Sequence, residues 1–399
     1  MSAHFGESLE TSLPRRMRRG PKVLAIAGVV LVVAVIVSAF VNLPYYALTP
    51  GTAQNVGLQI GVPASLNQNH PGSIDLVDVE VTPVRAIDWI YYELDSNASL
   101  ISSAAIQGPE TNSQYDTEGV LDMSDAQQAA TVVALTQLGY HVTVTPNGSL
   151  VYALDPGSPG ESALEVGDVI VAVGAKPVTT PVALSTALAP YQPGQSVTMT
   201  YRPYPKGVSR KVTFNTGVWR LQGTGANQQL ACTPTNVKSS WPIAKLVEVK
   251  GQTYLGSKQH PGHATACIGV LDAEPSYAIS KLPFQVNLNS EGIVGPSAGL
   301  AFTLGLMQKL DRGNLTNGMQ VAATGTMSVT GQIGAIGGIQ QKTVAVRSAG
   351  ASIFLVPQAN YAAAEKYAGS KLKVFAVSTI SQALKVLERF GGRIEKPAG

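Results

Sequence analysis

The stretch Val294-Gly-Pro-Ser-Ala-Gly-Leu300 carries Ser297, and the stretch Gly337-Gly-Ile-Gln-Gln-Lys-Thr-Val-Ala345 carries Lys342. A serine hydroxyl is a poor nucleophile until a nearby base takes its proton, and a lysine that burial keeps neutral can be that base. If the two side chains meet in the fold, the chain is a serine hydrolase whose chemistry needs no histidine.

Each stretch also has a purely structural interpretation. Pro296 and Ser297 are common near the start of a helix, and an apolar run follows from Leu300. In a helix over residues 338–348, Lys342 shares an apolar face with Ile339, Thr343, Val346 and Ala349. A lysine on such a face either extends its amine to water or has a lowered pKa and a chemical role.

Two other motifs are excluded. Gly295-Pro-Ser-Ala-Gly299 fits the nucleophile elbow of α/β-hydrolases, but that fold needs a histidine after the serine, and all five histidines precede Ser297. The glycine-rich run from Gly331 ends in Lys-Thr like a phosphate-binding loop, but Gln341 stands where that loop needs glycine. The sequence therefore predicts no ATP site and no cofactor.

Both stretches resemble the proteolytic domain of the Lon protease family, from about Leu282 to Asn360. The motifs that carry the resemblance are Leu282-Pro-Phe284, Gly295 to Leu300, Thr324-Gly-Thr326, Gly331 to Gly338, Lys342 and Phe354-Leu-Val-Pro357 with Asn360. The resemblance implies that Ser297 is the nucleophile, that Lys342 is the general base and that Thr324 orients the lysine. Lon usually has Asp where this chain has Val294, which implies a different local charge.

The order of segments is similar to that of membrane-anchored, ATP-independent Lon-like proteases that carry a PDZ domain. Residues 140–215 carry the PDZ resemblance, through the run from Asp155 to Val178 and a short helix expected over 181–188. A PDZ domain takes up an extended chain as an added strand beside a helix. We expect that groove between residues 149–154 and 181–188, and the alternative is a spacer domain whose groove is occluded.

The N-terminus predicts a membrane anchor. Residues 1–22 carry the whole net charge of +3, with five basic residues against Glu7 and Glu10, so no basic surface remains for nucleic acid. The run Val23 to Val41 has no charge and is long enough for a bilayer. The positive-inside rule places the tail in the cytoplasm and the rest outside. A signal peptide cleaved near Val37-Ser-Ala39 is the alternative.

The two cysteines, Cys232 and Cys267, fall in the part expected outside the cytoplasm, where disulfides form. A disulfide between them is favoured. The alternative is a metal site of His260, His263 and Cys267, which lacks a standard zinc spacing and an obvious fourth ligand.

The sequence thus predicts a multidomain α+β chain. Its parts are a basic cytoplasmic tail (1–22), a transmembrane helix (23–43), a β-rich membrane-proximal region ending in a helix (44–139), a PDZ domain (140–215) and a Lon-like proteolytic domain (216–399, core about 282–390). We expect a helix over 124–138 capped by Ser124 or Asp125, after a polar loop over 96–116. Residues 284–390 alternate strands and helices, which is typical of α/β layers.

These observations predict a single-pass membrane endopeptidase that cuts extracytoplasmic polypeptides without ATP, with the PDZ domain recruiting or regulating substrate. The family resemblance also implies a homo-oligomeric ring. The alternatives are an inactive scaffold that binds exported polypeptides through its PDZ domain, and a protein that cuts only itself.

Overall fold

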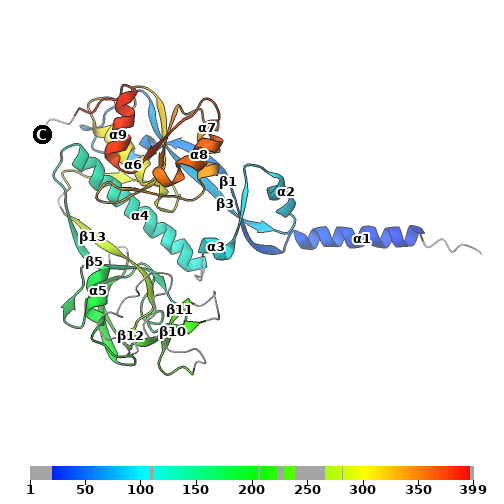
Figure 1. The fold of residues 1–399 in the computed structure, drawn as a ribbon, viewed down its shortest axis with the longest axis vertical. Helices are drawn as coiled ribbons and strands as arrows, with labels where there is room; N and C mark the ends of the chain where they lie inside the picture. The colour runs from blue at the N-terminus through cyan, green and yellow to red at the C-terminus, as the bar shows by residue number, and fades with distance from the viewer. Residues whose placement is uncertain are drawn as a thin grey trace, which may run out of the picture.

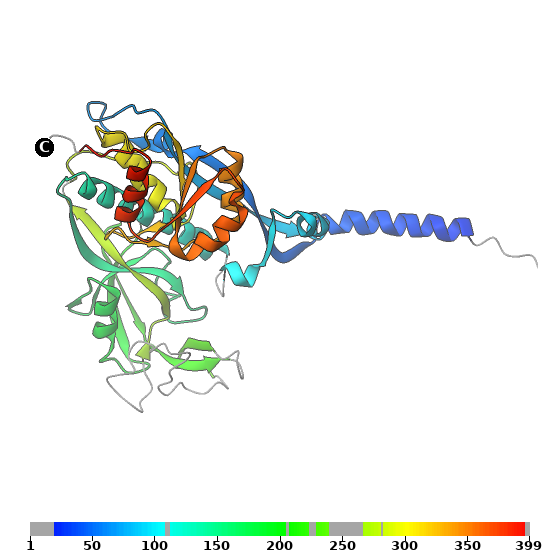
Figure 2. The same cartoon turned by 45° about the horizontal axis from the view of Figure 1, so that its top comes forward.

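The computed structural model describes residues 20–107, 112–204, 207–222, 229–238, 266–280 and 282–395. These residues form a large lobe and a small lobe, and helix α1 (Gly20–Ser38) projects away from both (Figure 1, Figure 2). Residues 1–19 and 251–263, and with them most of the predicted cytoplasmic tail and the histidines of the alternative metal site, lie outside the described residues.

The large lobe is built on a six-stranded sheet in the order β19-β18-β15-β3-β1-β4. The strands β3, β15, β18 and β19 are parallel to one another, whereas β1 is antiparallel to both β3 and β4. Their bounds are β1 (Asn42–Asn55), β3 (Ser73–Arg85), β4 (Ser99–Ser102), β15 (Gln320–Ala323), β18 (Ile353–Pro357) and β19 (Lys373–Val377).

Helices cover both faces of this sheet. Because successive side chains of a strand point to opposite faces, the central strands need apolar residues at every position. One face packs against α4 (Asn112–Gln137), α6 (Gly299–Leu310) and α9 (Ile380–Arg389), and the other against α7 (Ile339–Ser348) and α8 (Tyr361–Ala368). The α/β layers expected for the last third of the chain are therefore present.

Shorter elements complete the large lobe. They are η1 (Val56–Gln59), β2 (Ile60–Gly61), α2 (Trp89–Leu94), α3 (Ser103–Gln107), β14 (Asn287–Leu288), η3 (Pro296–Ala298), β16 (Thr326–Met327), β17 (Ile333–Gly334) and η4 (Gln358–Asn360).

The small lobe is a β-rich unit with one helix. Its main sheet has the order β13-β5-β6-β8-β9, with β7 paired to β6, and a second sheet has the order β11-β10-β12. The bounds are β5 (Thr143–Leu154), β6 (Val169–Val173), β7 (Lys176–Pro177), α5 (Pro181–Leu188), β8 (Ser196–Arg202), β9 (Arg210–Asn215), β10 (Gly217–Gln222), β11 (Gln229–Pro234), β12 (Ala266–Cys267) and β13 (Val270–Ser280). The Thr180 side chain caps α5 by accepting from the N–H of Ala183 at 3.1 Å.

The predicted domain boundaries are wrong on both sides of the small lobe. Residues 44–139 are not a separate region, because β3 pairs in parallel with β15 and α4 packs against α6. Residues 216–280 do not open the proteolytic domain, because β13 pairs with β5 in the small lobe. The buried strand β15 needs a partner on each edge, and the N-terminal strands supply one, so the small lobe is an insertion between the two parts of the large lobe.

The helix predicted over 124–138 is also longer than expected. Helix α4 begins at Asn112, so Ser124 and Asp125 lie inside it and cap nothing. The first half of α4 is polar, so the spacing of apolar residues does not predict it. Gly119 in this half nevertheless packs against Val294, and the carbonyl of Gly119 accepts from the N–H of Gly295 at 2.8 Å. Tertiary contact therefore extends the helix beyond its apolar half.

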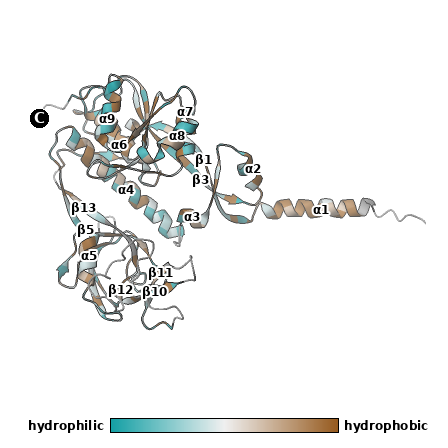
Figure 3. Ribbon diagram, viewed as in Figure 1, coloured by the Kyte–Doolittle hydropathy of each residue, from teal (hydrophilic) through white to brown (hydrophobic). Residues whose placement is uncertain are grey.

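The N-terminal helix is shorter than the predicted span of residues 23–43. Helix α1 ends at Ser38, and strand β1 begins at Asn42, which pairs with Arg85 of β3. The apolar side chains of α1 are exposed, for example Leu24 at 77% and Leu31 at 66% (Figure 3). Across the described ranges, no helix has the combination of length and apolar character that crossing a membrane requires.

Candidate active site

Ser297 is held at a turn between the strand layer and α6. It lies in η3, which Gly295 enters with a φ of 87°, a conformation that glycine adopts at little cost. The carbonyl of Ser297 accepts from the N–H of Gly325 at 2.9 Å, and the N–H of Leu300 donates to the carbonyl of Gly325 at 3.1 Å. The backbone around Ser297 is therefore fixed to the segment that follows β15.

Lys342 reaches the same place from the other side of the sheet. Helix α7 begins after Gly338, whose φ is 66°, and a Cβ there would lie 2.8 Å from Cγ1 of Val79 on β3. Only 3% of Lys342 is exposed. The side chain therefore does not extend to solvent, and the structural interpretation of this lysine does not apply.

The amine of Lys342 has three oxygen partners. Its Nζ donates to Ser297 Oγ at 2.8 Å, to the carbonyl of Val77 at 2.8 Å and to Thr324 Oγ1 at 3.5 Å. The structure thus brings together the three residues that the sequence singled out. The contact from Thr324 is the longest, and the hydroxyl of Thr324 donates to the carbonyl of Ser297 at 3.2 Å.

The environment of Lys342 favours a neutral amine. Burial lowers its pKa from 10.5 to about 8, because the charged form loses its hydration, and the nearby carboxylate of Asp78 raises the pKa against that effect. At a pH near 8 a large share of the amine is therefore unprotonated. An unprotonated amine 2.8 Å from a serine hydroxyl can accept the proton of that hydroxyl.

Val77 and Asp78 were not predicted as site residues. Both lie on β3, and Val77 is 265 positions from Lys342 in the sequence. Residues 75–82 show a strand pattern, but a backbone carbonyl has no sequence signal. Only the parallel pairing of β3 with β15 brings these residues to the site.

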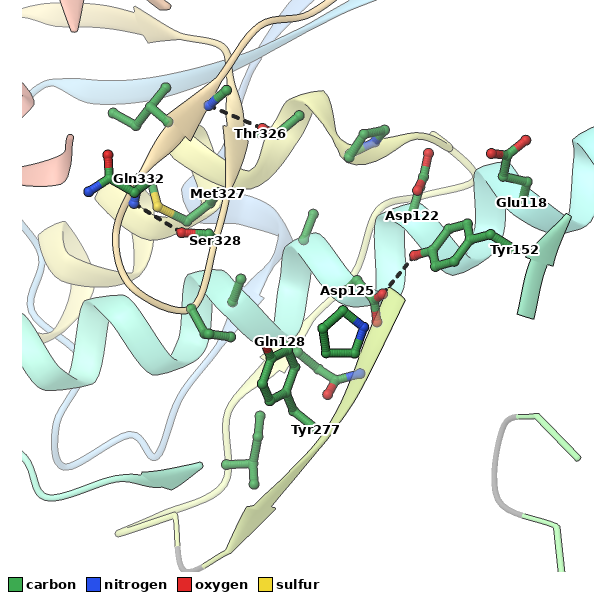
Figure 4. A pocket seen from close by; sticks show the side chains of 18 residues that line it. Glu118, Asp122, Asp125, Gln128, Tyr152, Tyr277, Thr326, Met327, Ser328 and Gln332 are labelled. Carbon is green, nitrogen blue, oxygen red and sulfur yellow. Dashed lines mark hydrogen bonds between the residues drawn. The ribbon is translucent and has the colours of Figure 1, made fainter. Parts of the chain in front are cut away.

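A cavity of about 530 Å³ adjoins the site (Figure 4). It reaches Pro296, the residue before Ser297, and is lined mainly by α4, the segment from Thr326 to Gly334, and strands β5 and β13. Its polar lining includes Glu118, Asp122, Asp125, Gln128 and Ser328. Because both lobes contribute to its wall, the cavity is a cleft at their junction.

The cysteines are paired. Cys232 of β11 and Cys267 of β12 form a disulfide across β10. The pairing removes the thiolate that the alternative metal site would need from Cys267. Among the described residues, no cluster of three His, Cys, Asp or Glu side chains is arranged to hold a metal ion.

The groove expected between residues 149–154 and α5 is occupied by the chain itself. Strand β13 pairs antiparallel with β5 along its whole length, from Val270 opposite Leu154 to Ser280 opposite Thr143. Ile268 and Val270 pack in the same apolar cluster as Leu184 of α5. Strand β13 therefore occludes the expected groove, as in the alternative interpretation of this domain.

Comparison with known proteins finds two family matches. Residues 290–389 match the model of the Lon protease (S16) C-terminal proteolytic domain, and residues 150–203 match the model of a PDZ domain. The second match lies within the small lobe, from β5 to the start of the loop after β8.

Two curated relatives match over part of the chain. The Lon protease of Treponema pallidum (strain Nichols) is 39% identical over 66 residues, which is 16% of this chain and 7% of that protein. Lon protease homolog 4, chloroplastic/mitochondrial, of Arabidopsis thaliana is 33% identical over 101 residues, which is 25% of this chain and 10% of that protein. The matched region thus spans a tenth or less of the length of these relatives.

Among solved structures, the second domain of the listeria protein Lin2157 aligns with a TM-score of 0.17 and 14% identity, over 22% of this chain and 82% of that chain. No conclusion rests on this likeness. The family matches confirm the resemblance predicted from the sequence: the region around Ser297 and Lys342 is similar to the proteolytic domain of Lon proteases, and the small lobe is similar to a PDZ domain.

Proposed function

We propose that this chain is an ATP-independent serine endopeptidase in which Ser297 is the nucleophile and Lys342 is the general base. One observation carries the proposal: a buried amine with a lowered pKa lies 2.8 Å from the serine hydroxyl. The match of residues 290–389 to a proteolytic domain supports the assignment of the reaction to peptide bonds.

In the first half of the reaction, Lys342 in its neutral form takes the proton of Ser297 while Oγ attacks the carbonyl carbon of the substrate. The tetrahedral intermediate then collapses, the C–N bond breaks, and the Lys342 ammonium returns its proton to the leaving amine. The product is an acyl ester on Ser297.

In the second half, a water molecule takes the place of the amine. Lys342 accepts a proton from the water as its oxygen attacks the ester, and it protonates Ser297 Oγ as the C–O bond breaks. The acid product leaves, and the dyad returns to its initial state. The carbonyl of Val77 holds the amine in place through both halves.

The developing oxyanion needs hydrogen-bond donors. Ser297 lies in η3 directly ahead of α6, so the backbone N–H groups of Ser297 and Ala298 stand at the start of a helical segment. A helix N-terminus carries free N–H groups and a partial positive charge, which stabilise an oxyanion.

We also propose that the enzyme acts at a membrane surface. The exposed apolar side chains of α1 and the basic residues that precede them in the sequence support attachment of the chain to a bilayer surface. The sequence has no Walker-type loop, so a substrate is expected to be already unfolded or loosely structured.

The test uses the full chain, incubated with an unfolded protein without nucleotide. Wild type is compared with Ser297→Ala and Lys342→Ala, and with two control variants of exposed residues, Ser348→Ala on α7 and Lys385→Ala on α9. Cleavage by wild type and both controls, with loss of at least about a hundredfold in the two dyad variants, supports the dyad.

Equal cleavage by all five proteins would assign the activity to a contaminant. Cleavage by Lys342→Ala but not by Ser297→Ala would keep the nucleophile and remove Lys342 as the base. Membrane attachment is tested separately, by sedimentation of the chain with lipid vesicles, and a chain that stays in the supernatant would contradict it.

A further inference from the structure

The PDZ-like small lobe has its strand-accepting edge filled by β13. A PDZ domain binds an extended chain as a strand added to the sheet edge beside a helix. Here β13 takes that place against β5, and Ile268 and Val270 pack with the apolar side chains of α5. A free polypeptide cannot use this edge while β13 is paired there.

The same strand faces the cleft beside Ser297. Side chains two residues apart lie on one face of a strand, and Pro275, Tyr277 and Ile279 of β13 all line the cavity. The cavity extends from these residues to Pro296, next to the proposed nucleophile. Figure 4 shows Tyr277 among the side chains that line it.

The small-lobe wall of the cavity, made by β5 and β13, is held against the large lobe. The hydroxyl of Tyr152 on β5 donates to Asp125 Oδ2 on α4 at 2.7 Å (Figure 4). Helix α4 in turn meets the nucleophile loop, where the carbonyl of Gly119 accepts from the N–H of Gly295. One continuous set of contacts therefore runs from the small lobe to the residues that hold Ser297.

We propose that the small lobe forms one wall of the substrate cleft rather than a separate recruiting site, and that Tyr277 contacts the bound polypeptide. This inference rests on the proposed function, because it takes the cleft at Pro296 as the path of the substrate. A half-buried tyrosine offers a flat apolar ring with a polar tip, which suits an extended peptide segment of varied sequence.

The first experiment measures KM and kcat of the full chain on an unfolded protein. We expect Tyr277→Ala to raise KM about tenfold, as for a well-placed aromatic contact, while Tyr277→Phe keeps KM within about twofold because the ring remains. The matched control is Tyr204→Ala, which removes a tyrosine of the small lobe outside the cavity and leaves KM and kcat unchanged.

A second experiment needs no catalysis and reports on binding alone. In a Ser297→Ala background, Tyr277 is replaced by the photoreactive p-benzoylphenylalanine and irradiated with the unfolded protein. We expect a crosslinked product, and none when the same group replaces Tyr204.

Wild-type KM in Tyr277→Ala, or no crosslink from position 277, would overturn the inference even if the dyad variants are inactive. Cleavage that survives Ser297→Ala would instead refute the proposed function, and the crosslink would still report whether polypeptide lies in this cleft.

Discussion

Lys342 Nζ lies 2.8 Å from Ser297 Oγ, although the two residues are 45 positions apart. Ser297 lies in η3 just ahead of α6 and Lys342 lies on α7, and α6 and α7 cover opposite faces of the sheet. The two side chains meet beside Thr324, which directly follows β15. A buried amine and a turn-bound hydroxyl thus form a dyad whose properties depend on the charge state of the lysine.

Activity should rise with pH through about 8. Burial lowers the pKa of Lys342 to about 8, and only the unprotonated amine can accept the serine proton. We expect kcat/KM to increase about tenfold for each unit of pH below that value and to level off above it. Lys342→Arg, which stays charged, should be inactive across the range. A flat profile between pH 6 and 9 would contradict this role.

Removing the charge of Asp78 should shift that profile. The Asp78 carboxylate raises the pKa of Lys342, so Asp78→Asn should lower that pKa and move the midpoint of the kcat/KM profile to lower pH. The control is Glu80→Gln, which removes an exposed carboxylate two residues along β3. A midpoint that moves equally in both variants would show that the effect is not local to Asp78.

Burial of the charged Lys342 should lower the stability of the large lobe. The folded-state pKa of Lys342 is about 8 against 10.5 for an ordinary lysine, so the penalty for burying the charge is complete below pH 8 and is relieved between pH 8 and 10.5. Lys342→Met should therefore raise the free energy of unfolding by about 1–3 kcal/mol at pH 7, less whatever the unpaired Val77 carbonyl costs.

Urea unfolding of the wild type and Lys342→Met at pH 7 and pH 10 measures this difference. The gain from the substitution should shrink at the higher pH. A gain that is the same at both values would mean that packing, not charge burial, sets it.

Gly338 should be required at the position before the first residue of α7. Gly338→Ala places a Cβ 2.8 Å from Val79 in a backbone with a φ of 66°, so we expect a loss of about 1–3 kcal/mol in stability and a large loss of activity. Gly337→Ala is a close control, because a Cβ there has nothing within 4 Å and the residue is not at positive φ. Thermal unfolding and the peptidase assay compare the two, and equal behaviour would contradict the expectation.

The disulfide should stabilise the small lobe only. It joins residues with a sequence separation of 35, and closing a loop of that size is worth about 3–4 kcal/mol in the chain-entropy model. The double variant Cys232→Ser, Cys267→Ser should be cut faster by added trypsin within the small lobe, while cleavage sites in the large lobe stay protected. Equal loss of protection in both lobes would show that the lobes unfold together.

The sequence by itself singled out Ser297, Lys342 and Thr324 and indicated most of the last third of the fold. Ser297 lies in a helix-start signal, Lys342 lies on the apolar face of the helix expected over 338–348, and the strands and helices expected to alternate over residues 284–390 are present. These signals are local, so they can be read without knowing what each segment packs against.

Only the tertiary structure decided which segments make the large lobe. The pairing of β3 with β15 brings the carbonyl of Val77 to the amine of Lys342. The hydrophobic periodicity of each strand does not indicate which other strand it pairs with. The start of α4 and the place of β13 were missed for the same reason, because a polar half-helix and a strand within an unpatterned segment are stabilised by distant partners. Long-range contacts, not local propensity, therefore set the boundaries of the lobes and the wall of the cleft.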